Sequence, residues 1–180
     1  GFVGAGRMGR PMIARLVDAG HTVRAVARNA EAHAGVAAIG ASPVPSAAEA
    51  ARDAEVLIVC VFSDDQVREI FLDGTLPTAL STGALVILHT TGSPDTTVAV
   101  AQAVARRDIG VVDAPVSGGP HDIAAGTLTV FLGGSDTDAQ RATGVLGAYA
   151  DPILHVGGPG DGQRVKLVNN VLFAAQIGHI

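Results

Sequence analysis

Several residue types are scarce in this chain. It has one cysteine, no tryptophan, one tyrosine and a single lysine, Lys166, among its 12 basic residues. One cysteine excludes an intramolecular disulfide bond, and Cys60 lies in the apolar run VLIVCV, where we expect it to be part of the core. The net charge of −5 argues against a nucleic-acid partner recognised through a basic patch.

Long apolar segments are also lacking. No run approaches the ~20 apolar residues that cross a bilayer, and no charged start followed by an apolar block indicates a secretory signal. We therefore expect a cytoplasmic protein without a membrane partner. The first strand is short and the last helix has no closing glycine and proline, so we expect the sequence to belong to a longer protein.

The chain does contain short apolar runs that alternate with helical patterns. With 180 residues, 48% of them hydrophobic, it has the length and composition of one substantial α/β domain. The expected strands lie at 1–3, 22–27, 56–61, 84–89, 110–114, 128–133 and 152–156. The expected helices lie near 9–19, 30–39, 65–72, 95–107 and 136–149.

Near-continuous apolar strands separated by helices predict a Rossmann-type α/β fold, with a doubly wound, mostly parallel sheet covered on both faces. Ligands of such sheets bind beyond the carboxyl ends of the strands. The glycine-rich segment GGPGDG at 157–162 separates the last strand from the last helix. We therefore expect a sheet domain at 1–157 and a helical segment at 158–180 that begins a second domain.

The first strand is followed directly by a glycine-rich loop that opens a helix. A G-x-G-x-x-G pattern at this junction is typical of dinucleotide binding, because its backbone approaches a pyrophosphate and the helix N-terminus offers free N–H groups. The loop is predicted to make domain 1–157 a dinucleotide-binding domain. Its candidate cofactor residues are Gly4, Ala5, Gly6, Arg7, Met8 and Gly9.

The end of the second strand bears on the choice of cofactor. An acidic residue there would bind the ribose of NAD, but the chain has Ala27 followed by Arg28. An arginine can pair with the 2′-phosphate of NADP, which makes NADP the preferred cofactor. NAD stays possible because Glu31 is close by, and Arg28 could also be a solvated charge at the strand end.

Two further segments contain candidate substrate-binding residues. In PVSGG, the hydroxyl of Ser117 and the backbone N–H groups of Gly118 and Gly119 can form a nest for a carboxylate, although Ser-Gly-Gly is also ordinary turn chemistry. In the last helix Lys166 and Asn170 stand at i and i+4, so both can reach one small ligand. A desolvated lysine can release and regain a proton, which arginine cannot.

Four motifs together resemble the β-hydroxyacid dehydrogenase family, which includes 3-hydroxyisobutyrate dehydrogenases and tartronate semialdehyde reductases. They are GFVGAGRMGRPM, TTGSP, DAPVSGGPHDIAAGTLTVFLGG and GPGDGQRVKLVNN, in the family's order along the chain. The resemblance implies an NAD(P)-dependent enzyme that transfers hydride between the nicotinamide and a small β-hydroxyacid or semialdehyde. It also implies a helical C-terminal domain that makes a homodimer or tetramer.

The resemblance assigns roles to individual residues. Ser117, Gly118 and Gly119 correspond to residues that bind the substrate carboxylate, Lys166 to the catalytic acid/base, and Asn170 to an asparagine that orients the substrate.

On the cofactor side, Thr91 corresponds to a threonine near the nicotinamide. Val61, Phe62 and Gln66 fall on a cofactor-contacting segment that more often reads Leu-Pro. The chain also has Leu88 and His89 where the family often has an aspartate.

Two alternatives stay open. An imine-reductase-like enzyme would share the nucleotide loop but generally lack this lysine with the Ser-Gly-Gly motif, and a non-catalytic module would be expected to lose the lysine. The six histidines, at 21, 33, 89, 121, 155 and 179, include no pair at the i, i+4 spacing of zinc ligands, so no metal site is expected. His121 follows the Ser-Gly-Gly loop and is either a substrate contact or a surface residue.

Overall fold

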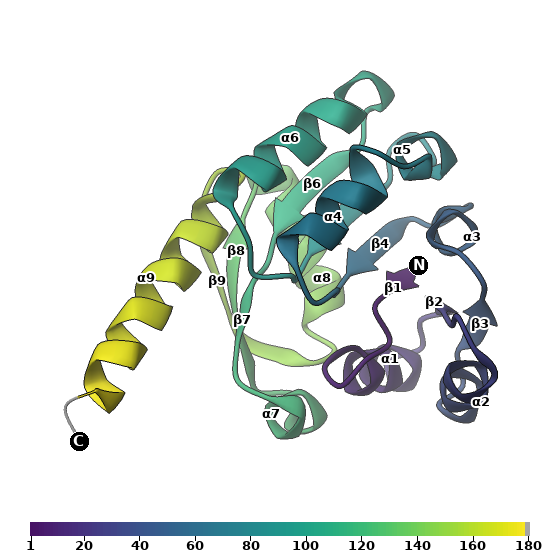
Figure 1. Cartoon of the computed structure of the whole chain (residues 1–180), viewed down its shortest axis with the longest axis horizontal. Coiled ribbons are helices and arrows are strands. Elements are labelled where there is room, and N and C mark those ends of the chain that lie inside the picture. The colour runs from purple at the N-terminus through teal and green to yellow at the C-terminus, as the bar shows by residue number, and fades with distance from the viewer. Residues whose placement is uncertain (179–180) are drawn as a thin grey trace.

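The computed structural model describes residues 1–178, which form one mostly parallel sheet between helices (Figure 1). The strands are β1 (Phe2–Val3), β2 (Arg24–Val26), β3 (Ser42–Val44), β4 (Val56–Val59), β5 (Leu85–Leu88), β6 (Gly110–Asp113), β7 (Val116–Ser117), β8 (Leu128–Gly133) and β9 (Ala150–Gly157). The helices are α1 (Gly9–Asp18), α2 (Ala30–Ala38), α3 (Ala47–Ala51), α4 (Asp64–Phe71), α5 (Leu76–Ala79), α6 (Pro94–Val104), the 3-10 helix η1 (Ala105–Arg107), α7 (Pro120–Ala125), α8 (Asp136–Leu146) and α9 (Asp161–Ile177).

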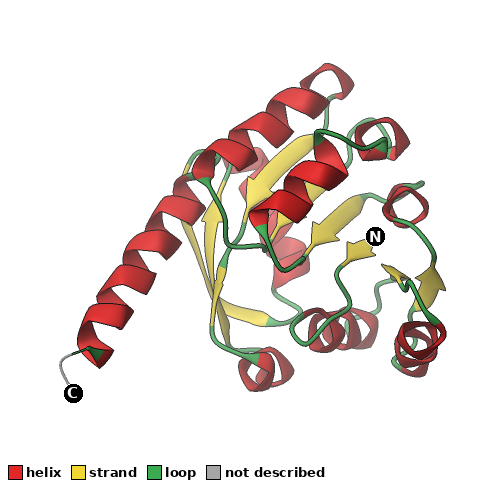
Figure 2. Ribbon diagram, in the orientation of Figure 1, coloured by secondary structure: helices red, strands yellow, loops and turns green. Residues whose placement is uncertain are grey.

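The strand order is β3-β2-β1-β4-β5-β6-β8-β7, with β9 paired to β8. The first six strands in this order pair in parallel, β8 runs antiparallel to β6 and β7, and β9 runs parallel to β8. Figure 2 shows the helices on both sides of this sheet, with α9 projecting from one end. The order of the first six is that of the Rossmann fold, so the predicted fold class is confirmed.

Alternation along the strands explains why they are apolar throughout. In β4, Ile58 packs into a core that includes side chains of α1, α2 and α8. Its neighbours Leu57 and Val59 point to the opposite face, where α4, α5 and α6 cover the sheet. Both faces are buried, so neither set of side chains can be polar.

The sequence did not predict five short elements. These are β3, α3, α5, β7 and α7, which have between two and six residues each and show no periodic pattern long enough to detect. The segment expected as one helix at 95–107 forms α6 followed by the 3-10 helix η1. The helix expected at 136–149 ends at Leu146. Cys60 directly follows β4, where it is half-buried and packs against the core, and burial raises the pKa of its thiol to about 11. His179 lies outside the described residues.

A buried pair, His89 and Tyr149, joins the end of β5 to the segment before β9. The Nδ1 atom of His89 lies 2.6 Å from the carbonyl oxygen of Ala114, and Nε2 lies 2.7 Å from the Tyr149 hydroxyl. Since a carbonyl only accepts, Nδ1 carries the hydrogen and Nε2 accepts the hydroxyl proton of Tyr149. Burial lowers the pKa of His89 to about 4, so the ring is neutral in the folded protein near pH 7.

Stability is therefore expected to fall as the pH drops from about 6.5 to about 4. In that window the unfolded chain protonates His89 near its ordinary pKa of 6.5, whereas the folded chain does not until about pH 4. Urea unfolding of the wild type and of His89→Asn, at several pH values, measures the effect. The advantage of the wild type should shrink as the pH falls; a difference that does not change with pH would contradict the prediction.

Candidate functional site

Close contacts dictate the glycines of the loop after β1. Gly4 has φ +107°, and a Cβ there would collide with the carbonyl group of Cys60 at the end of β4. A Cβ on Gly9 would collide with the carbonyl of Gly4 and contact the ring of Phe2. A Cβ on Gly6 would meet nothing within 4 Å. The first and third glycines are thus required by packing, whereas the second faces open space into which a pyrophosphate can fit.

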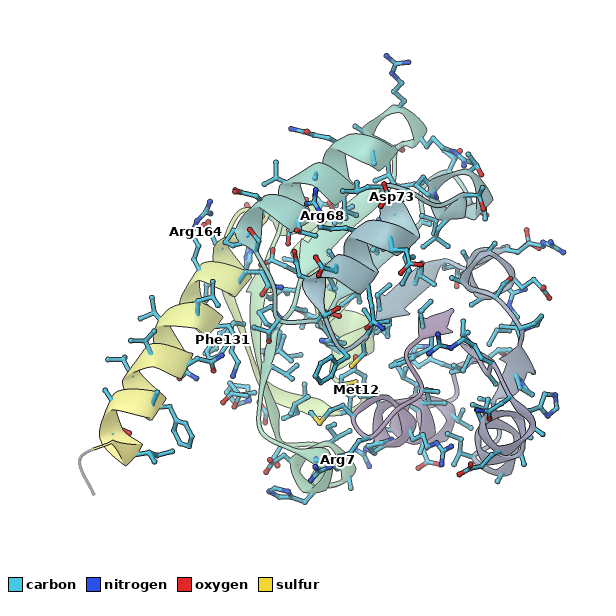
Figure 3. All side chains as sticks on the ribbon, in the orientation of Figure 1. Arg7, Met12, Arg68, Asp73, Phe131 and Arg164 are labelled. Atoms are coloured by element: carbon cyan, nitrogen blue, oxygen red, sulfur yellow. The ribbon has the colours of Figure 1, made fainter. Side chains whose placement is uncertain are left out.

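The helix that follows this loop presents an open N-terminus. The N-cap of α1, Met8, offers no side-chain hydrogen bond, and the first turn contains no acidic residue. The first backbone N–H groups of a helix have no partner within it and carry partial positive charge, which favours an anion. Arg7 is exposed at this end of α1 (Figure 3).

A cavity of about 880 Å³ lies over this loop, at the carboxyl ends of β1, β2 and β4. Its volume is in the range of small-molecule and cofactor sites. Every predicted cofactor residue except Thr91 lines it, namely Gly4, Ala5, Gly6, Arg7, Met8, Gly9, Arg28, Val61, Phe62 and Gln66. Residues far apart in the sequence thus meet at the place where the fold predicts a ligand.

The individual contacts refine two of these assignments. The side chain of Gln66 caps α4, since its Oε1 accepts hydrogen bonds from the backbone N–H groups of Phe62 (2.9 Å) and Ser63 (3.3 Å). Gln66 therefore fixes the turn on which Phe62 stands with its side chain almost fully exposed. Arg28 is exposed at the cavity wall, and Thr91 is exposed just beyond β5.

The Ser-Gly-Gly loop contains an acid that the sequence did not single out. Ser117 ends β7 and is half-buried, and Gly118 has φ +127°. The backbone N–H of Gly119 donates to Oδ2 of Asp122 at 2.7 Å, and Nε2 of His121 lies 3.2 Å from the same oxygen. One of the N–H groups expected to bind a substrate carboxylate is therefore engaged by Asp122, while His121 is an exposed residue paired with it.

Helix α9 is anchored to the sheet by Asp113, the last residue of β6. This side chain is fully buried; its Oδ1 accepts from the backbone N–H of Gly160 at 2.6 Å and its Oδ2 from that of Gln163 at 2.7 Å. Burial raises the pKa of Asp113, and these two hydrogen bonds oppose the rise. A carboxylate at a helix N-terminus is favourable. A Cβ on Gly162 would collide with the Phe131 carbonyl, so the first turn of α9 lies directly on β8.

The side chain of Gln163 connects the same turn of α9 to the segment after β5. It is almost fully buried; Oε1 accepts from the N–H of Gly92 at 2.9 Å, and Nε2 donates to the carbonyl of Thr90 at 2.8 Å. The hydroxyl of Thr90 in turn donates to the carbonyl of Val61 at 3.0 Å. The carboxyl ends of β4 and β5 are thus tied to α9.

In α9 some polar side chains are more buried than the apolar ones, the reverse of an ordinary surface helix. Lys166 and Asn169 are half-buried, whereas Val168, Val171 and Leu172 are 60 to 68% exposed. Figure 3 shows Arg164 pointing away from the sheet, where it pairs with Asp161.

Burial lowers the pKa of Lys166, and no carboxylate of residues 1–178 lies within 4.0 Å of its ammonium group. Asn170 is exposed, one turn beyond Lys166. Lys166, Asn170 and the Ser-Gly-Gly loop lie outside the 880 Å³ cavity.

Residues 1–178 contain neither a cluster of metal-ligating side chains nor a membrane-spanning helix. Within residues 1–178 no group of three or more histidine, cysteine or acidic side chains could hold a metal ion. Among the helices of that range, none combines the length and the hydrophobicity that a bilayer span requires.

Known proteins resemble this chain closely. The 3-sulfolactaldehyde reductase of Escherichia coli (strain K12) is 37% identical over 175 residues, which are 97% of this chain and 59% of that protein. A structure of Mycobacterium tuberculosis 3-hydroxyisobutyrate dehydrogenase with L-serine superimposes with a TM-score of 0.91 at 37% identity, over 97% of this chain and 60% of that one. The chain thus spans about three fifths of these relatives.

A more distant likeness and a family match complete the comparison. An imine reductase from Pseudomonas sp. has a TM-score of 0.89 at 21% identity, covering 99% of this chain and 62% of that one, which shows a shared fold alone. Residues 1–157 match the family described as the NAD-binding domain of 6-phosphogluconate dehydrogenase. The chain therefore belongs to this family of NAD-binding domains, and its resemblance to the β-hydroxyacid dehydrogenases is confirmed.

Proposed function

We propose that this chain is the cofactor-binding part of an enzyme that transfers hydride between a nicotinamide cofactor and a small β-hydroxyacid or semialdehyde. One observation carries the proposal: a cavity lies over the glycine-rich loop at the carboxyl ends of the strands, and Gln163 ties the ends of β4 and β5 to α9, the helix that contains the half-buried Lys166. The names of the relatives, 3-hydroxyisobutyrate dehydrogenase and 3-sulfolactaldehyde reductase, support this substrate class. Retention of the lysine argues against a non-catalytic module.

The bound cofactor would supply hydride chemistry, and the protein would supply its binding and orientation. The N–H groups of the loop from Gly4 to Gly9 would hold the pyrophosphate, and Thr91 would lie near the nicotinamide. Arg28 stands at the cavity wall where it can pair with a 2′-phosphate, which supports NADP as the preferred cofactor. Binding of NAD would use the same loop without that pair.

The substrate carboxylate would bind to the hydroxyl of Ser117 and the N–H of Gly118, with Asn170 orienting the rest of the molecule. Lys166 would donate a proton to the carbonyl oxygen in reduction and accept the hydroxyl proton in oxidation. The lowered pKa of Lys166 supports both roles, because the neutral amine becomes accessible nearer to neutral pH.

We further propose that residues 158–180 lead into a helical C-terminal domain through which the enzyme forms a homodimer or tetramer. The apolar side chains exposed on α9 support this, because contiguous apolar surface is typical of an interface. A cytoplasmic location stays a prediction.

Arg28→Ser in the full-length enzyme tests the cofactor preference. Loss of charge-assisted hydrogen bonds to a phosphate, each contributing about 1.5–3 kcal/mol, should weaken NADPH binding by roughly tenfold or more. NADH binding should change little, because NADH lacks that phosphate. Fluorescence titration with both cofactors gives the two Kd values, and Arg106→Ser, at an exposed arginine of η1, is the control. Equal losses for NADPH and NADH would show that Arg28 does not select the cofactor.

Lys166→Arg in the full-length enzyme tests the acid/base role. Arginine keeps the charge but cannot exchange the proton, so kcat should fall by about 10²–10⁴-fold. Affinity for NADPH should stay within about twofold of the wild type. Turnover is followed by NADPH absorbance with a panel of β-hydroxyacids and semialdehydes. Turnover near the wild-type rate would remove the assignment.

Asp122→Asn tests the charge beside the Ser-Gly-Gly loop. Asparagine can still accept from the N–H of Gly119 but removes a negative charge that repels a substrate carboxylate, an interaction on the order of 1 kcal/mol near the surface. KM for carboxylate substrates should fall several-fold with kcat little changed, and the effect should shrink at high salt. Asp138→Asn, at the start of α8, is the matched control. An unchanged KM would place the substrate carboxylate away from this loop.

A further inference from the structure

We infer that Gln163 is a positioning residue that couples the nicotinamide side of the site to the helix carrying Lys166. The inference rests on the proposed function for its catalytic part, but its physical basis is the hydrogen-bond pattern. Gln163 is three residues before Lys166 on α9 and is 2% exposed. It is therefore fixed by its contacts rather than by solvent.

The two polar atoms of the Gln163 amide make hydrogen bonds of opposite direction. The oxygen accepts from Gly92 (2.9 Å) and the nitrogen donates to Thr90 (2.8 Å), two backbone groups on either side of Thr91. An amide satisfies both, whereas a carboxylate has no hydrogen to donate and lysine or arginine has no acceptor. Binding both backbone groups beside Thr91 therefore requires a side chain that donates and accepts, as the amide of glutamine does.

Asp64, the first residue of α4, also binds this segment and the start of α6. Its Oδ1 accepts from the N–H of Ser93 at 3.1 Å, and its Oδ2 accepts from the hydroxyl of Thr96 at 2.7 Å. The segment from Thr90 to Ser93 is thus fixed to α4 by Asp64 and to α9 by Gln163. It cannot shift toward or away from a cofactor without straining one of these links.

Exposed Thr91 lies between the two backbone groups that Gln163 binds, and Lys166 lies about one helical turn further along α9. A ligand that orders the segment around Thr91 therefore also orders the first turns of α9. By reciprocity, ordering of α9 favours the cofactor-binding arrangement of that segment. Gln163 thus sets the separation between the nicotinamide end and the proton donor.

The test uses Gln163→Met and Gln163→Glu in the full-length enzyme. The first keeps the length of the side chain without its polar atoms, and the second keeps the acceptor for Gly92 but turns an oxygen toward the carbonyl of Thr90. Gln140→Met, at an exposed glutamine of α8, is the matched control. Urea unfolding establishes that each variant is folded at the assay temperature. If Gln163→Met is too unstable, the test relies on Gln163→Glu, which retains the hydrogen bond from Gly92.

Hydrogen–deuterium exchange is the first readout. Saturating NADPH should slow exchange of backbone amides in residues 163–170 of the wild type and of Gln140→Met, and this protection should be lost in both Gln163 variants. The second readout is kinetic: kcat should fall by about tenfold to 10²-fold, the order expected when a reacting group is misplaced by up to about 1 Å. The pH profile of kcat should also shift, while KM for the hydroxyacid changes less.

The outcomes separate the coupling from the proposed reaction. Variants that are less stable but keep the wild-type protection, kcat and pH profile would overturn the inference, because Gln163 would then be structural only. A wild type that turns over no hydroxyacid or semialdehyde, yet loses NADPH-induced protection of α9 on Gln163→Met, would refute the proposed function and uphold the coupling.

Discussion

The contact between the carboxylate of Asp113 and the first turn of α9 is the constraint on which the rest of the site depends. Both partners are buried, and each would be costly alone: a buried carboxylate without donors loses its hydration, and a buried helix N-terminus leaves N–H groups unpaired. Together they satisfy each other. The direction of α9 is thereby fixed at the end of β6, and with it the positions of Gln163 and Lys166.

The N-terminus of α1 differs from those of α4, α8 and α9. Within the described residues, α4 and α8 begin with serine caps, and α9 begins at the buried carboxylate of Asp113. The N-terminus of α1 has no side-chain cap and no acid in its first turn, and it faces the open side of Gly6. An internal anion completes α9, whereas α1 is left to be completed by an anion from outside, as expected of a phosphate-binding helix.

The sequence predicted what local spacing dictates and missed what distant contacts decide. Gly4 and Gly9 were identifiable because close backbone contacts exclude other residues there, and the cofactor residues between Gly4 and Gln66 follow strands that meet at one sheet edge. Asp113 and Gln163 act across 47 to 73 positions of the chain, so no local pattern marks them. The one local sign of Asp113 was its place as an acidic residue at the end of the otherwise apolar strand β6. Asp122 gave no such signal, because an acid in the first turn of a helix is ordinary capping chemistry.

Arg164 and Lys166 lie in different environments although they are only two residues apart. Arg164 points outward and pairs with Asp161 at 2.6 Å, so a permanent charge is sufficient there. Lys166 turns toward the protein, on the side of the helix that Gln163 anchors, and loses part of its hydration without gaining a carboxylate among the described residues. Desolvation without a compensating charge lowers the pKa of a lysine, whereas an ion pair would raise it. Because Asp113 satisfies the N-terminus of α9 directly, that helix needs no second carboxylate there, and Lys166 has no acidic partner among the described residues.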